Sequence, residues 1–127
     1  MILDLRGNPG GLLTSAVDVA SCFVPKGSDI VSARGRGFPA VLYRSRVDPV
    51  LDPNTKLAVL VNGQTASAAE IVSGAIQDLD VGVIVGGDRT FGKVRTINSK
   101  DPHNLMITNM SKHNQTKKTI VSYSFFV

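Results

Sequence analysis

Two segments of this sequence carry the residue types of a serine nucleophile and a lysine base. Ser67 lies within Gln-Thr-Ala-Ser-Ala-Ala-Glu (residues 64–70), and Lys93 ends Thr-Phe-Gly-Lys (residues 90–93). A serine hydroxyl becomes a strong nucleophile when a neighbouring group takes its proton, and a lysine amine does this when burial lowers its pKa. Both histidines lie beyond residue 100, so lysine is the favoured base. The pattern predicts nucleophilic catalysis by a Ser-Lys pair.

The same serine also fits a structural role. Ser67 and Glu70 match the Ser-x-x-Glu capping box, in which the serine closes open amides at a helix start and the glutamate reaches back. A nucleophile there would gain from this geometry, because the helix dipole and free amides stabilise negative charge on the attacked carbonyl. Position alone leaves both roles open, and Glu70 supports Ser67 in either.

A cluster of turn-forming residues, Asn-Pro-Gly-Gly at residues 8–11, also has two interpretations. The simpler one is a turn. The functional one is an oxyanion hole, since glycine allows the backbone to approach a substrate carbonyl closely. An amide of Gly10 or Gly11 would then act together with the amide of Ala68.

Residues 87–93 suggest a rival function. Their glycine and lysine spacing matches a phosphate-binding loop that follows a strand, with Lys93 at the phosphate-contacting position. Val94 stands where such a loop has a Ser or Thr for magnesium, and the sequence predicts no helix there to direct amides at phosphate. Nucleotide binding is therefore the less favoured alternative.

Charge is distributed unevenly along the chain. The net charge is +4, but residues 1–93 hold nine basic and nine acidic side chains, so residues 94–127 supply the excess. Arg-Gly-Arg-Gly-Phe (residues 34–38) resembles an RNA-binding segment, yet a single copy in a neutral body does not favour nucleic acid as a partner. The lone cysteine, Cys22, sits in an apolar helical pattern and is interpreted as core packing.

The elements that must position these residues follow from apolar spacing. We expect strands at residues 2–5, 30–33, 40–43, 57–61 and 83–85, and helices at residues 12–24 and 66–79. Strands 30–33 and 40–43 should form a ribbon, and residues 48–55 a loop. Nearly all-apolar strands alternating with helices predict an α/β fold with mainly parallel strands and covering helices. No apolar run approaches the about 20 residues of a membrane span, and residues 94–127 cannot be assigned to the fold.

Three ordered motifs together resemble one family. Leu-Asp-Leu-Arg-Gly-Asn-Pro-Gly-Gly-Leu (residues 3–12), the segment at 65–78 and the segment at 90–93 closely resemble the C-terminal processing, or tail-specific, proteases. The resemblance covers residues 1–93. It implies part of a ClpP/crotonase-like catalytic core at residues 1–93, followed by an off-family tail at residues 94–127.

The resemblance also implies a reaction. Ser67 would be the nucleophile, Lys93 the general base, and Ala68 with Gly10 and Gly11 the oxyanion hole. The reaction would be endoproteolysis near the C-terminus of a protein or peptide substrate through an acyl-enzyme, without a metal or organic cofactor. Lys93 acts only when neutral, so activity should fall on acidification. An exported compartment, such as the thylakoid lumen of a chloroplast, is the implied location.

The sequence departs from the family pattern after Lys93. The family normally continues Gly-Lys-Gly with a glutamine four residues after the lysine, whereas Val94 and Ile97 occupy those positions here. Lys-Val-Arg at residues 93–95 can be encoded by a common 5′ splice junction, which suggests a read-through intron as the origin of the tail. The alternative to an active peptidase is therefore an inactive fragment that acts at most as a binding module.

Overall fold

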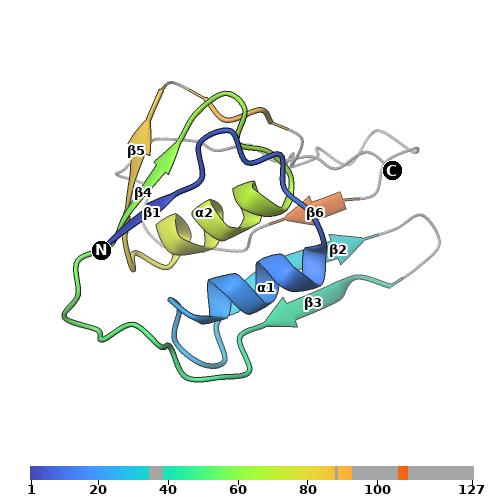
Figure 1. Cartoon of the computed structure of the whole chain (residues 1–127). Helices are drawn as coiled ribbons and strands as arrows, with labels where there is room; N and C mark the ends of the chain where they lie inside the picture. The colour runs from blue at the N-terminus through green and yellow to red at the C-terminus, as the bar shows by residue number, and fades with distance from the viewer. Residues whose placement is uncertain (35–38, 88, 93–105, 109–127) are drawn as a thin grey trace.

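The computed structural model describes residues 1–34, 39–87, 89–92 and 106–108. Two helices and six strands are present in these residues (Figure 1). In chain order they are β1 (Ile2–Asp4), α1 (Leu13–Ser21), β2 (Asp29–Arg34), β3 (Val41–Arg44), β4 (Ala58–Val61), α2 (Ala68–Asp78), β5 (Val83–Gly86) and β6 (Met106–Thr108).

The strands expected to lead into the candidate site form a three-stranded parallel sheet. Its order is β1-β4-β5, and both pairings are parallel. Leu3, Val59 and Ile84 share one register position, and Val59 in the central strand is fully buried. The alternate positions face the other way, where Ile2 and Val83 are exposed. One face of this sheet therefore joins the core, as strand alternation requires.

A second sheet has the order β3-β2-β6, and all of its pairings are antiparallel. β2 and β3 form the ribbon predicted from the sequence, with Ser32 opposite Leu42 and a register shift between Asp29 and Val31. β6 comes from the segment that sequence patterns could not assign, and Ile107 pairs with Ala33. The described strands are thus divided equally between a parallel and an antiparallel sheet.

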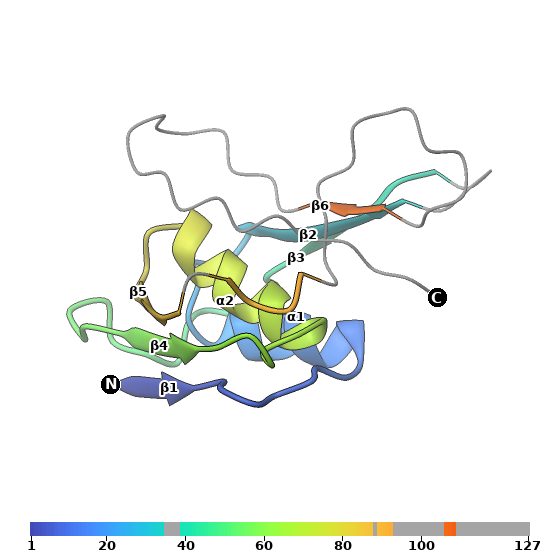
Figure 2. The ribbon, with the colours of Figure 1, turned by 90° about the horizontal axis from the view of Figure 1, so that it is seen from above.

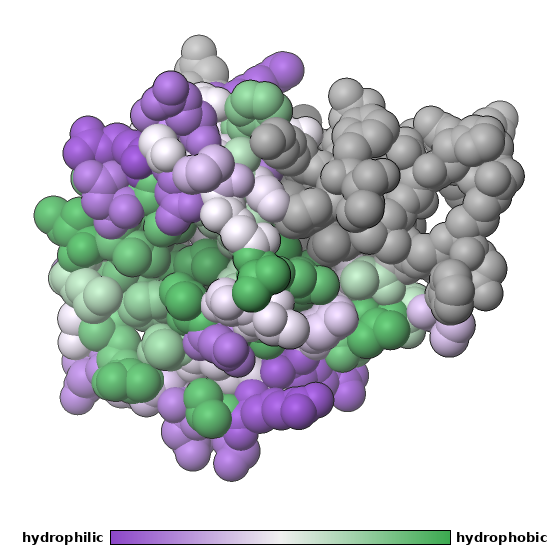
Figure 3. Space-filling view, turned by 45° about the vertical axis from the view of Figure 1, so that its right-hand side comes forward, coloured by the Kyte–Doolittle hydropathy of each residue, from purple (hydrophilic) through white to green (hydrophobic). Residues whose placement is uncertain are grey.

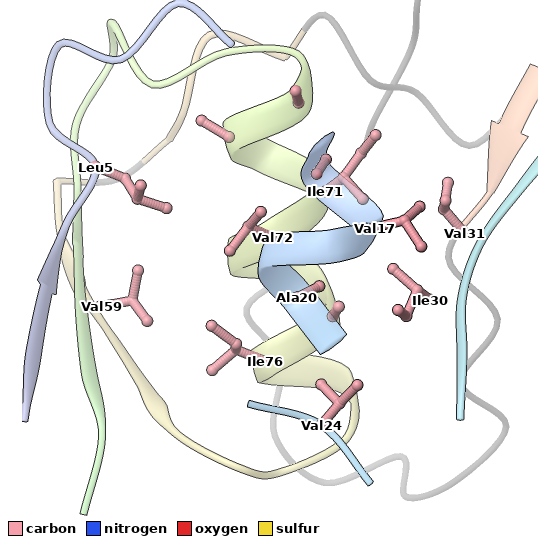
Figure 4. Packing of buried hydrophobic residues seen from close by; sticks show 14 of the residues in the cluster. Leu5, Val17, Ala20, Val24, Ile30, Val31, Val59, Ile71, Val72 and Ile76 are labelled. Carbon is pink, nitrogen blue, oxygen red and sulfur yellow. The ribbon is translucent and has the colours of Figure 1, made fainter. Parts of the chain in front are cut away.

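The two helices lie between the two sheets (Figure 2). Leu5 and Val59 point toward them from the parallel sheet, and Ile30 and Val31 from the other side (Figure 4). α2 is the central element of the core, because nine of its eleven residues are buried. Of the nine residues of α1, only four are buried. Burial of apolar side chains on both sides of α2 is the main source of stability for this arrangement.

The predicted elements are confirmed, with the boundaries shifted by a few residues. α1 ends at Ser21 rather than at residue 24, and α2 begins at Ala68 because Ser67 is its N-cap. No helix in the described part of the chain is long and apolar enough to cross a membrane. On the face shown in Figure 3, hydrophobic side chains gather in a band between hydrophilic residues above and below.

Candidate functional site

Three loops meet beyond the carboxyl ends of the parallel strands. They are residues 5–12 after β1, residues 62–67 after β4 and the segment at 87–92 after β5. Ala66 N donates to Asn8 O at 2.9 Å, and Phe91 N donates to Thr65 O at 2.9 Å. Loops at this edge of a parallel sheet are the usual place for a binding or catalytic site. The fold therefore brings together all three motifs that the sequence singled out, as far as Gly92.

The hydroxyl of a buried threonine joins the first two loops by hydrogen bonds. Thr65 is fully buried, and its hydroxyl donates to Leu5 O at 2.8 Å and accepts from Asn62 N at 3.0 Å. The Asn62 side chain accepts from Gly7 N at 3.0 Å. Because buried polar groups are costly when unpaired, this network specifies one arrangement of the loops.

Ser67 has an unusual backbone conformation. Its φ is 56° and its ψ is −124°, a left-handed conformation that residues with a side chain rarely adopt. Conformations of this kind cost about 1–3 kcal/mol and concentrate at functional sites. In hydrolases of another fold, a nucleophilic serine sits on a similar strained turn between a strand and a helix. Ser67 lies on such a turn between β4 and α2, and it is half-buried.

Glu70 is the buried acidic residue of the site. Its exposed fraction is 0%. Its Oε2 accepts from Ser67 N at 2.8 Å, which is the glutamate contact of a capping box. Its Oε1 accepts from Thr90 Oγ1 at 2.6 Å and from Gly92 N at 2.8 Å. One carboxylate thus connects the loop of Ser67 with the segment after β5.

Gly10 packs against the start of α2. A Cβ added to it would come within 2.6 Å of Ala66 O, Ala68 N and the Ser67 Cβ, and its φ is +93°. The Gly10 amide donates to Asn8 Oδ1 at 2.8 Å. Within the described residues, neither the Gly11 nor the Ala68 amide donates a hydrogen bond. The glycine turn is therefore next to an open helix amide, as an oxyanion hole would require.

Lys93, the predicted base, lies outside the described residues, so its role stays a prediction. Gly92, the residue bonded to it, is held by Glu70. Asp88 and the segment at 35–38 also lie outside the described residues.

The groups that sequence reasoning missed are Thr90, Thr65 and Asn62. The sequence shows that these residues are polar and lie between apolar elements, but they have hydrogen-bond partners in other parts of the chain that the sequence does not reveal.

An exposed ion pair lies at the end of β1. Arg6 donates to both carboxylate oxygens of Asp4, at 3.0 and 2.7 Å. The side-chain hydrogen bond from Arg6, followed by its backbone hydrogen bond, lowers the pKa of Asp4 from 3.8 to about 2, and the same pairing raises the pKa of Arg6. Among the described residues, no group of three or more His, Cys, Asp or Glu is arranged to hold a metal ion.

Comparison with known proteins settles the family. The model of peptidase family S41 matches residues 1–121. The chain belongs to peptidase family S41. A carboxy-terminal-processing protease of Bartonella bacilliformis is 46% identical over 99 residues, which cover 76% of this chain and 22% of that protein. The chloroplastic C-terminal processing peptidase of Tetradesmus obliquus is 41% identical over 93 residues, covering 73% of this chain and 19% of that protein.

Solved structures agree with this S41 assignment. The photosystem II D1 C-terminal processing protease superposes with a TM-score of 0.65 and 40% identity, covering 75% of this chain and 24% of that one. A putative S41 protease from Bacteroides fragilis has a TM-score of 0.63 at 20% identity and supports the fold alone. This S41 chain spans about a fifth of the length of the curated relatives that it matches. The expected resemblance to C-terminal processing proteases and the partial α/β core are confirmed.

Proposed function

We propose that this S41 chain is a serine-type endopeptidase that cleaves protein substrates near their C-terminus, with Ser67 as nucleophile and Lys93 as general base. The supporting observation is the position of Ser67. It lies at the N-terminus of α2 in a left-handed conformation, between the glycine turn and the segment that leads to Lys93. Strain of this kind persists where the surrounding structure specifies it, and it is typical of catalytic turns.

The reaction follows from the chemistry of these groups. Ser67 Oγ attacks the scissile carbonyl carbon while its proton passes to the neutral Lys93 amine, which gives a tetrahedral oxyanion. The oxyanion collapses, the C–N bond breaks, and the lysine ammonium returns the proton to the leaving amine. Water then attacks the acyl ester with Lys93 again as base, which releases the acid and restores Ser67. No metal or organic cofactor enters these steps.

The oxyanion would be held by backbone amides. Within the part of the chain that the structure describes, no group accepts a hydrogen bond from Ala68 N at the start of α2, where the helix dipole also favours negative charge. The second donor would come from the Gly10–Gly11 turn. If Gly10 supplies it, its amide must leave Asn8 Oδ1, so substrate binding would include a small movement of this turn.

The substrate class is proposed from the relatives. Several are named as carboxyl-terminal processing proteases, and one similar structure is the protease that processes the C-terminus of photosystem II D1. We infer that the substrate is a protein or peptide with an exposed C-terminus. A chloroplastic relative supports an exported compartment such as the thylakoid lumen as the location.

The nucleotide-binding alternative gains no support from the described residues. In a phosphate-binding loop, backbone amides must be free to face the phosphates. The amides of Phe91 and Gly92 donate instead to Thr65 O and to Glu70 Oε1.

The test is peptide hydrolysis by the 127-residue chain and two variants, Ser67→Ala and Lys93→Ala. A protein with an unstructured C-terminal tail serves as substrate, and cleavage is followed by mass spectrometry. We expect each variant to lower kcat by at least about 1,000-fold. Matched controls are Ser15→Ala and Lys26→Ala, which change an exposed serine and an exposed lysine. A folded chain without hydrolysis would instead support the binding module, and hydrolysis that survives Lys93→Ala would exclude the dyad.

A further inference from the structure

The Glu70 carboxylate makes more contacts than helix capping needs. Its Oε2 bond to Ser67 N completes the capping function. Its Oε1 lies outside that motif and accepts from both Thr90 Oγ1 and Gly92 N. These partners are 20 and 22 residues away in the sequence. A capping explanation accounts for one of the three contacts and leaves the other two without a purpose.

The three donors require a carboxylate. Ser67 N and Gly92 N are backbone donors that cannot accept, and they bind different oxygens of Glu70. A glutamine, which also suits a capping box, has one acceptor oxygen and an NH₂ group that only donates. Either orientation of its amide would set the NH₂ group against one of the two backbone amides. A buried donor without an acceptor is costly, so the segment that loses its partner would shift.

We propose that Glu70 is a positioning residue of the Ser-Lys site, and this inference rests on the proposed function. Its Oε2 holds the amide of Ser67 and supports the left-handed backbone of the nucleophile. Its Oε1 holds Gly92, the residue bonded to Lys93. A single buried side chain therefore sets the nucleophile and the base segment relative to each other. Because a misplacement of about 1 Å can lower a rate about 100-fold, this contact should control kcat.

Glu70→Gln tests the inference, because it keeps the size of the side chain and removes one acceptor. We expect kcat for peptide hydrolysis by the full chain to fall about 100-fold, while KM changes less than about threefold. The matched control is Ser73→Ala, which deletes a buried hydrogen bond to Glu70 O on the same helix but touches neither loop. A merely structural role would lower the melting temperature in both variants and leave kcat per folded molecule unchanged.

Amide hydrogen exchange at Ser67 and Gly92 measures these contacts without relying on activity. We expect at least one of the two amides to exchange faster in Glu70→Gln than in the unmodified chain, because the glutamine accepts from only one of them, and we expect both to be unchanged in Ser73→Ala. Unchanged exchange at both amides in Glu70→Gln would overturn the inference whether or not the chain hydrolyses peptides. If Glu70→Gln does not fold, Thr90→Val decides instead. It removes one donor to Oε1 and should lower kcat by a smaller factor, and an unchanged kcat would overturn the inference.

The two proposals fail in different ways. A folded chain without Ser67-dependent hydrolysis rejects the proposed function. Hydrolysis that requires Ser67 and Lys93 but keeps its full kcat in Glu70→Gln rejects only the positioning role.

Discussion

The parallel sheet contains two similar units, β1 followed by α1 and β4 followed by α2, but the two helices begin very differently. α2 begins at a strained Ser67 that is bound to a buried glutamate in its first turn. α1 begins at Leu12, an exposed residue in an ordinary extended conformation with no side-chain cap, and its first turn has no acidic residue. The connection into α2 is therefore strained and held by hydrogen bonds to a buried side chain. The residue that begins α1 has an ordinary backbone conformation and no side-chain hydrogen bond of this kind.

This difference indicates where the fold has specialised. A helix start needs about one good cap to be stable, so the unmodified start of α1 shows what this fold requires locally. At α2, the strained Ser67 is bound by a buried carboxylate that also binds the segment after β5, which is more than helix formation requires. Strain that the surroundings maintain points to function rather than to folding.

The largest effect is expected where the two units touch, at Gly10. Gly10→Ala places a Cβ within 2.6 Å of backbone atoms of Ala66 and Ala68, and its φ of +93° disfavours any side chain. We expect a loss of about 3 kcal/mol in the free energy of unfolding from the combined strain and overpacking. Chemical denaturation measures it.

Gly11→Ala is the matched control, because an added Cβ at Gly11 meets nothing within 4 Å. Its free energy of unfolding should stay within about 0.5 kcal/mol of the unmodified chain. Equal destabilisation by the two substitutions would show that the turn does not pack against α2 as described.

A smaller effect should isolate the strain at Ser67. Ser67→Gly and Ser67→Ala both remove the hydroxyl, but only glycine adopts a φ of 56° without cost. We expect the glycine variant to be more stable than the alanine variant by about 1 kcal/mol, and both to be inactive. Equal stabilities would mean that the start of α2 relaxes once the hydroxyl is gone.

The sequence alone predicted the two strand-helix units, but it did not predict the hydrogen bonds that distinguish the start of α2. Apolar alternation located β1, β4 and β5, because each strand has one buried face, and Ser67-x-x-Glu70 marked the start of α2. The Oε1 contacts of Glu70 were not predictable, since Thr90 and Gly92 reach it only through tertiary folding. β6 also escaped prediction, because three residues within a segment without clear periodicity give no usable pattern. Short sequence patterns therefore predict the helices and strands, whereas the hydrogen bonds that join the loops depend on residues far apart in the sequence.

A substitution at the start of α1 should stabilise that helix. Leu12 has the extended φ and ψ of an N-cap, −70° and 136°, and its side chain is exposed. Leu12→Ser supplies the missing acceptor for the first amides of α1, so we expect the chain to gain about 0.5–1 kcal/mol of stability. Thermal unfolding measures the gain. Peptide hydrolysis should be unchanged, and a loss of activity would show that the start of α1 is also specialised.

The smallest expected effect concerns Asp4, an exposed acidic residue of the first unit, in contrast to the buried Glu70 of the second. Hydrogen bonds from Arg6 lower the pKa of Asp4 from 3.8 to about 2 in the folded chain. A lowered folded-state pKa stabilises the fold above about pH 4, and this contribution disappears as the pH falls toward 2. Asp4→Asn should therefore lower the melting temperature slightly at pH 7, and the difference should shrink toward pH 2. Since the pair is exposed, 1 M salt should also reduce the difference. A difference that grows on acidification would contradict this assignment, and one unaffected by salt would show that the Asp4–Arg6 pair is shielded from solvent.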